Sequence, residues 1–265
     1  MINFVPIPTL FSIGNFHIFT FGVIFIISFL VSLILWGKSL KGKLDEKHIL
    51  NIAVLILLGV LIGTRLLYVF INFPYYWHEP LKILAFNEGG SSSFGGFLAV
   101  LFVWLYARKN KIKFSFILDT IAPYLTLALA LGRLGCFFNW DDFGIASILP
   151  WAVKVPGDVA RHPTQIYLLI ANLIVFFILL KLQKRKEKGD KGILSMNGSI
   201  FLFFILYYAI NRFFIDFLRA YQPHEFFFGL VVSQWFSLIF IIIASLILIK
   251  LKQKSLKSQN RQEML

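Results

Sequence analysis

Seven long apolar runs constrain what this chain can fold into. Most of them reach the roughly 20 residues that an α-helix needs to cross the hydrocarbon core of a bilayer, where a helix satisfies its own backbone hydrogen bonds. The 265 residues are 58% hydrophobic, which is more apolar than ordinary soluble domains are. The runs cover residues 16–36, 49–73, 94–107, 114–138, 164–182, 198–218 and 231–251. We expect an all-α integral membrane protein with seven transmembrane helices in a single transmembrane domain, residues 1–265.

Basic residues are concentrated in alternate connections between these runs, and their distribution predicts the orientation. The first, third and fifth connections and the C-terminal tail are rich in Lys and Arg, whereas the other side carries only Lys82, Lys154, Arg161 and Arg219. Cytoplasmic segments of membrane proteins carry such an excess. We therefore expect the N-terminus outside, the C-terminus in the cytoplasm, and a small extracytoplasmic head at residues 139–163. Orientation thus explains the excess of 26 Lys and Arg over 13 Asp and Glu without a nucleic-acid partner.

Three arginines, Arg65, Arg133 and Arg212, lie inside the apolar runs. A guanidinium keeps its proton, so within a membrane it must pair, reach water or hold a ligand. In the expected orientation each of the three falls in the outer half of its helix, close to the level of Arg161 and Arg219. A phosphate is an especially favourable partner for several cations in such a place. The pattern therefore predicts a site for an anionic phospholipid at the outer leaflet.

Some of these charges also have structural interpretations. Asp216 follows Arg212 by one helical turn, so this pair can neutralise itself, and Asp119 is interpreted as structural for similar reasons. Arg133 is also typical of an interfacial arginine at a helix end. The residues Tyr75, Tyr76, Trp77, Trp140 and Trp151 are typical of an aromatic belt at the outer boundary.

Three segments combine glycine, polar and basic residues. They read GRLGCFFN at residues 132–139, GGSSSFGG at 89–96 and RHPTQIY at 161–167. They resemble the GRxGNFxNxE, GGMSFHGG and RHPSQLYE motifs of the prolipoprotein diacylglyceryl transferase family. Further along the chain, Arg212, Asp216 and Arg219 fall where that family reads FR and then EFFR, and Gln234 and Ser237 are similar to its GQxLS segment.

The resemblance implies an enzyme of the bacterial cytoplasmic (inner) membrane. Members of that family move a diacylglyceryl group from phosphatidylglycerol to the lipobox cysteine thiol of a prolipoprotein at the outer leaflet. The implied partners are phosphatidylglycerol, prolipoprotein signal peptides with a lipobox cysteine and the membrane itself, and no metal or cofactor is expected. The catalytic residues implied are Arg133, Arg219 and Asp141. The implied phosphatidylglycerol-binding residues are Arg133, Asn139, Arg65, Arg161, His162 and Gln165.

The departures from the family pattern leave an alternative open. Phe94 and Phe21 stand where the family has a histidine and a tyrosine, Cys136 replaces an asparagine, Asp141 replaces a glutamate, and Leu168 replaces another glutamate. A paralogue that binds anionic phospholipid without transferring it is the main alternative, since fold alone does not fix function. A transporter or channel is disfavoured, because the buried charges gather at one leaflet and no inverted repeat is visible.

Overall fold

The computed structural model describes residues 1–14, 16–79, 82–83, 96–190 and 192–263, and this part of the chain is mainly helical. Five of its helices are long and apolar enough to cross a membrane, namely α1, α2, α5, α6 and α8, and α7 is a shorter apolar helix. The α-helices are α1 (Thr20–Ser39), α2 (Glu46–Ile71), α3 (Phe73–His78), α4 (Phe97–Lys109), α5 (Phe114–Asn139), α6 (Thr164–Glu187), α7 (Ser199–Ile215) and α8 (Val232–Glu263). These are the helices of an integral membrane protein.

Short strands and 3₁₀ helices occupy the connections. The strands are β1 (Ile2–Asn3), β2 (Thr9–Ile13), β3 (Phe16–Phe19), β4 (Val153–Lys154), β5 (Phe226–Phe227) and β6 (Leu230–Val231), and the 3₁₀ helices are η4 (Gly192–Ser195) and η5 (Pro223–Glu225). Strand β1 pairs with β4 in parallel, whereas β2 with β3 and β5 with β6 form antiparallel pairs.

The helix predicted from residue 16 begins later than expected. Residues Phe16–Phe19 form β3, which pairs with β2, and α1 starts at Thr20. The backbone N–H of Thr20 donates to the Pro8 carbonyl at 3.0 Å, and its hydroxyl donates to the Ile7 carbonyl. A short apolar run does not distinguish strand from helix, so hydropathy alone placed this boundary wrongly. The run predicted from residue 94 begins outside the described residues, and α4 continues it from Phe97.

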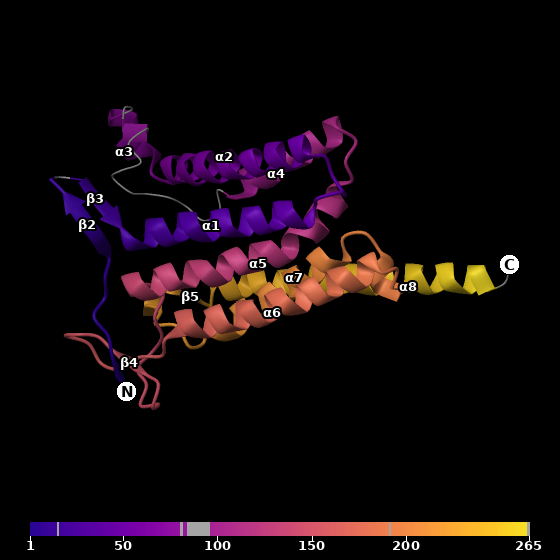
Figure 1. The fold of residues 1–265 in the computed structure, drawn as a ribbon. Coiled ribbons are helices and arrows are strands. Elements are labelled where there is room, and N and C mark those ends of the chain that lie inside the picture. The colour runs from indigo at the N-terminus through magenta and orange to yellow at the C-terminus, as the bar shows by residue number, and fades with distance from the viewer. Residues whose placement is uncertain (15, 80–81, 84–95, 191, 264–265) are drawn as a thin grey trace. The chain divides into compact units, whose positions relative to one another are not determined.

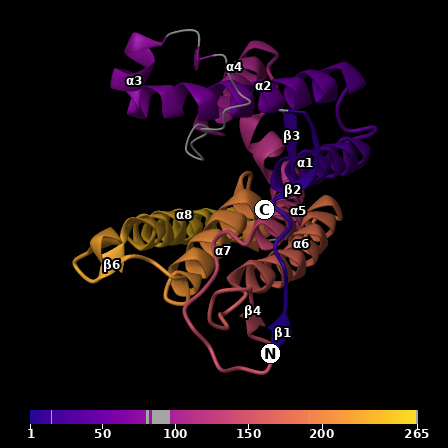
Figure 2. The same cartoon turned by 90° about the vertical axis from the view of Figure 1, so that its left-hand side faces the viewer.

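The chain divides into two compact units. The larger unit comprises Met1–Trp36 and Leu118–Leu265, and the smaller unit comprises Gly37–Ile117. In the larger unit α7 and α8 lie side by side in both views (Figure 1 and Figure 2). A buried cluster of Ala122, Leu179, Ile200 and Phe204 joins α5, α6 and α7. In the smaller unit α2 packs on α4, and a Cβ added to Gly59 would lie 2.3 Å from the Ala99 Cα, so only glycine permits this helix contact.

A buried carboxylate on α5 fixes the start of α7. Asp119 Oδ2 accepts hydrogen bonds from Lys186 Nζ and from the Gly198 N–H, both at 2.8 Å, and Oδ1 accepts from the Phe201 N–H at 3.0 Å. The first N–H groups of a helix have no partner within the helix itself. Asp119 therefore caps α7 from a neighbouring helix while Lys186 of α6 balances its charge, which agrees with its structural interpretation.

The segment after α5 folds into a compact head. Backbone pairing joins Gly144 to Arg219, and joins Arg161 to both Ala146 and Val153. Beneath these pairings, Trp140, Val153 and Val155 form a small core with Phe4, Phe137 and Phe143 packed on it. We call the end of the larger unit that carries this head the head end; α5 and α7 end there, and α6 and α8 begin there.

Candidate functional site

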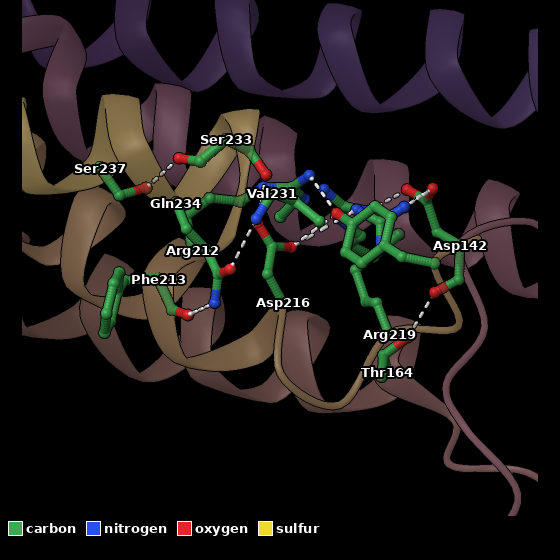
Figure 3. Close-up of polar contacts among 12 residues, drawn as sticks. Asp142, Thr164, Arg212, Phe213, Asp216, Arg219, Val231, Ser233, Gln234 and Ser237 are labelled. Atoms are coloured by element: carbon green, nitrogen blue, oxygen red, sulfur yellow. Dashed lines mark hydrogen bonds and ion pairs between the residues drawn. The ribbon is translucent and has the colours of Figure 1, made fainter. Parts of the chain in front are cut away.

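One carboxylate at the head end is shared by two arginines. Asp142 Oδ2 lies 2.8 Å from Arg133 Nη1, and Asp142 Oδ1 accepts from Arg219 Nη2. Figure 3 shows Asp142 and Arg219 directed toward each other from the loop after α5 and the segment after α7. The arginine side chains are only 17% and 11% exposed, and that of Asp142 is 34% exposed. Two guanidinium groups from distant parts of the chain thus reach the same anion.

The position of Asp142 is set by the turn that ends α5. The Asp141 N–H donates to the Cys136 carbonyl at 2.8 Å, and both Trp140 and Asp142 adopt positive φ angles near 60°. Aspartate tolerates this left-handed conformation better than most residues. The first residues of α6 hold the turn, since the Thr164 hydroxyl donates to the Asp142 carbonyl and Gln165 Nε2 donates to the Asp141 carbonyl at 2.5 Å.

The position of Arg219 is set by the backbone of the head. The Ile145 N–H donates to the Leu218 carbonyl at 2.9 Å, and the Ala220 N–H donates to the Phe143 carbonyl at 3.2 Å. At this crossing a Cβ on Gly144 would lie 2.5 Å from the Leu218 carbonyl oxygen and 2.6 Å from the Cβ of His162. Only glycine fits here, so Gly144 allows the Arg219 segment to approach the head.

A second carboxylate, Asp216, forms the centre of an adjoining network. It accepts from the Tyr221 hydroxyl at 2.9 Å and the Ser233 hydroxyl at 2.5 Å, and it lies 3.2 Å from Arg212 Nε. Arg219 Nη1 lies 3.9 Å away, so Arg219 touches both acidic groups (Figure 3). The Asp216 side chain is fully buried. The structural pairing predicted for Arg212 is therefore confirmed.

The same network extends to the start of α8. Gln234 is buried, and its side chain accepts from the Val231 N–H at 3.0 Å and donates to the Phe213 carbonyl at 3.1 Å. The Ser237 hydroxyl donates to the Ser233 carbonyl at 2.7 Å (Figure 3). Gln234 thus links the start of α8 to α7, whereas the Ser237 bond lies within α8. Burial raises the pKa of Tyr221, which lies outside the long helices.

Asp141 and Asn139 lie beside the arginine pair without joining it. Asn139 Nδ2 donates to Asp141 Oδ2 at 2.5 Å, and Asp141 is exposed. Asp141 was the carboxylate named from the family pattern, yet its neighbour Asp142 makes both ion pairs. Sequence reasoning missed this role, because two successive aspartates after a helix give no signal that distinguishes them.

Arg161 and His162 are engaged within the head. Arg161 Nε and Nη2 donate to the two carboxylate oxygens of Asp158 at 2.6 and 2.9 Å, and its guanidinium lies 5.0 Å from the centre of the Phe143 ring. This hydrogen bonding lowers the pKa of Asp158. His162 Nδ1 lies 3.1 Å from the Tyr167 hydroxyl. Arg161 is thus half of a local ion pair in this structure.

Three further residues singled out from the sequence remain, namely Arg65, Phe21 and Phe94. Arg65 belongs to the smaller unit, where Nε donates to the Ile83 carbonyl at 3.0 Å and Nη2 to the Lys82 carbonyl at 2.6 Å; its convergence with Arg133 stays a prediction. Phe21 packs beside α5, because a Cβ on Gly135 would lie 3.1 Å from its ring. Phe94 and most of the GGSSSFGG segment lie outside the described residues.

Comparisons with known proteins place the chain among membrane transferases. The family model described as prolipoprotein diacylglyceryl transferase matches residues 8–250. A protein of Geobacter sulfurreducens named phosphatidylglycerol–prolipoprotein diacylglyceryl transferase is 32% identical over 219 residues, which cover 80% of this chain and 82% of that protein. Proteins with the same name from Methylobacillus flagellatus and Finegoldia magna are 34% and 30% identical, covering 91% and 95% of this chain and 95% and 98% of theirs.

Proposed function

The chain belongs to the prolipoprotein diacylglyceryl transferase family, and we propose that it moves a diacylglyceryl group from phosphatidylglycerol to the lipobox cysteine thiol of a prolipoprotein. The proposed location is the outer leaflet of the bacterial cytoplasmic membrane. We assign the phosphate-binding site to the head end because Arg133 and Arg219 share one anion there, the Asp142 carboxylate. A phosphate presents oxygen acceptors that suit the same two guanidinium groups.

The proposed reaction is a displacement at carbon. The cysteine sulfur attacks the diacylglyceryl carbon that carries the phosphate, a C–S bond forms, and the C–O bond to the phosphate breaks. Glycerol phosphate leaves with the electron pair of that bond, and the thiol proton passes to solvent or to a base. Negative charge grows on the leaving phosphate, so Arg133 and Arg219 stabilise the transition state electrostatically.

The nucleophile needs little help from a dedicated base. A free thiol has a pKa of about 8.5, and nearby cations favour the thiolate. A histidine at position 94 is therefore dispensable for the reaction in principle, although a base raises the rate. His17 and His162 are the proposed alternative bases, and Asn139 and Asp141 are proposed contacts of the lipid headgroup. Arg161 and Gln165 support the site by shaping the head and the turn after α5.

Seven spans with the N-terminus outside remain the proposed topology. The five long apolar helices support it, and the apolar helices α4 and α7, of 13 and 17 residues, are the candidates for the other two spans. Single-cysteine labelling at Ser147 in the head and at Ser195 between α6 and α7, in a Cys136→Ser background, tests the orientation in intact cells. An impermeant maleimide should label only position 147. Labelling of position 195 alone would show that the orientation is opposite to the proposed one.

Purified protein in liposomes tests the function directly. Liposomes with phosphatidylglycerol and a lipobox peptide should yield a diacylglyceryl peptide, detected by its mass, whereas phosphatidylcholine liposomes or a Cys→Ser peptide should not. Arg133→Ala should abolish the product. Arg185→Ala is the matched control, because Arg185 pairs with Asp190 in an exposed position away from the head. Retention of phosphatidylglycerol by the wild type without any product would support the lipid-binding alternative instead.

A further inference from the structure

A narrow pocket between α5, α6 and α7 adjoins the arginine pair, and of its lining residues only Arg133 takes part in the mechanism above. It contains about 270 Å³ of empty space, part of which is open to the surroundings, and its enclosed part has room for about one water-sized group. Its lining comprises Leu129, Arg133, Leu168, Asn172, Tyr208, Asn211 and Arg212. Two leucines thus face two arginines, two amides and a phenol within helices of an integral membrane protein. Polar side chains in such helices are costly and mark functional sites by default.

The amides of this pocket are held in place by a hydrogen-bond chain. The Tyr207 hydroxyl donates to Asn172 Oδ1 at 2.9 Å, and Asn211 Nδ2 donates to the Tyr207 hydroxyl at 3.0 Å. Asn172 is only 4% exposed. Its oxygen is thereby occupied, and in the described part of the chain its Nδ2 group donates to no protein acceptor. The pocket therefore offers the Asn172 Nδ2 donor to a ligand oxygen, with the Arg133 and Arg212 side chains in its lining.

The pocket lies just beyond the arginine pair when viewed from the head end. Leu129 and Tyr208 precede Arg133 and Arg212 by one helical turn, about 6 Å further from the head. Asn172 follows Gln165, which holds the turn after α5, by two turns, about 10 Å. In a phospholipid whose phosphate is bound by Arg133 and Arg219, the groups that follow on the membrane side are the glycerol backbone and its ester carbonyls.

We propose that this pocket binds an ester carbonyl of the phospholipid substrate, with Asn172 as the main donor. The inference rests on the proposed function, since the phosphate must first occupy the arginine pair. A carbonyl oxygen only accepts hydrogen bonds, which matches the donors of the pocket. Its small size excludes a whole headgroup, and its guanidinium groups repel an amine. By binding this carbonyl, Asn172 would fix the position of the reacting carbon relative to the two arginines that bind the phosphate.

A comparison of ester-linked and ether-linked lipids distinguishes carbonyl binding in the pocket from phosphate binding at the arginine pair. Diether phosphatidylglycerol keeps the phosphate and headgroup and lacks both carbonyls. The wild type should bind the diester form about five- to tenfold more tightly, the usual value of one hydrogen bond to a well-placed donor. Asn172→Leu should lower diester affinity to the diether level and leave diether affinity unchanged. Gln183→Leu is the matched control, because Gln183 lies on the same buried face of α6 near its other end.

Each outcome decides the inference. Equal affinity of the wild type for the two lipids overturns it and leaves the phosphate site standing, whereas failure to bind either lipid overturns the proposed function as well. An unchanged preference in Asn172→Leu also overturns it. If Asn172→Leu does not fold, Asn211→Leu takes its place, because it removes the hydrogen bond to Tyr207 that positions Asn172. Loss of the diester preference then supports the proposal, and an unchanged preference overturns it. Binding is measured by fluorescent-lipid displacement in detergent micelles.

Discussion

Asp142 pairs with Arg219 across 77 residues of the chain, and its second oxygen holds Arg133. Both guanidinium groups are therefore directed at one point before any substrate arrives. Preorganised charge of this kind lowers a barrier without reorganisation during the reaction. The same arrangement means that a bound phosphate must share the arginines with Asp142 or displace it.

Lysine should not replace the paired arginines. Arg133→Lys and Arg219→Lys keep the charge and lose the planar fork that can hold two phosphate oxygens. We expect each to lower transfer by about tenfold or more, since hydrogen bonds to charged groups are worth roughly 1.5 to 3 kcal/mol. Initial rates on a lipobox peptide measure the effect, with Arg185→Lys as the control. Full activity of Arg133→Lys would make Arg133 a simple interfacial anchor.

Asp142→Asn should destabilise the lipid-free protein and increase its stabilisation by lipid. The two arginines lose their shared counter-charge, at a cost of about 1 to 2 kcal/mol, below the roughly 3 to 5 kcal/mol of a fully buried pair, because Asp142 is partly exposed. Phosphatidylglycerol should restore more stability to the variant than to the wild type. Thermal unfolding with and without lipid tests this, and Asp141→Asn is the neighbouring control. Identical lipid shifts in wild type and Asp142→Asn would show that phosphate does not take the place of Asp142.

Asp119→Asn should weaken the fold without changing lipid affinity. Its carboxylate is 7% exposed and pairs at 2.8 Å with Lys186, whose side chain is 20% exposed, so the change leaves a partly buried cation without its counter-charge, at a cost of up to about 3 kcal/mol. Asp190→Asn removes a partner of the exposed Arg185 and should cost less than about 1 kcal/mol. Urea or thermal unfolding in detergent compares the two variants. Equal effects would mean that the cap on α7 contributes little.

The stability contribution of Tyr221 should disappear at alkaline pH. Burial raises its pKa, so the folded protein holds the phenolic proton more tightly than the unfolded chain, in which the pKa is about 10. The contribution is fully present below about pH 10 and is lost as the pH rises through the raised folded value. Difference titration of tyrosinate absorbance between wild type and Tyr221→Phe should show one late-titrating group. A difference curve centred at or below about pH 10 would contradict the burial of this hydroxyl.

Hydropathy predicted the helical membrane fold, because burial in lipid imposes length and composition on each span, whereas the orientation inferred from charge stays a prediction. The Arg212–Asp216 pair was also predictable, since one helical turn separates its members. Other features depend on specific contacts that hydropathy and charge do not encode. Strand β3 at the start of the first apolar run is one example. The engagement of Arg161 by Asp158 within the head is another.

The choice between Asp141 and Asp142 shows the same limit at the site. The two residues have the same side chain, and only the turn geometry after α5 directs one toward the arginines and the other toward Asn139. A family pattern transfers residue types by position. It does not transfer the backbone angles that determine where their side chains point.

The cap supplied by Asp119 has a consequence for how the protein is made. Ribosomes synthesise α5 and α6 before α7. The Asp119 carboxylate and Lys186 are therefore made before the Gly198 and Phe201 N–H groups that donate to the carboxylate. The first turn of α7 reaches its final hydrogen bonding only when it meets helices that have already emerged. The order of synthesis thereby places the cap before the helix that it completes, and a chain truncated before α7 would keep the Asp119–Lys186 pair while lacking the N–H donors of Gly198 and Phe201.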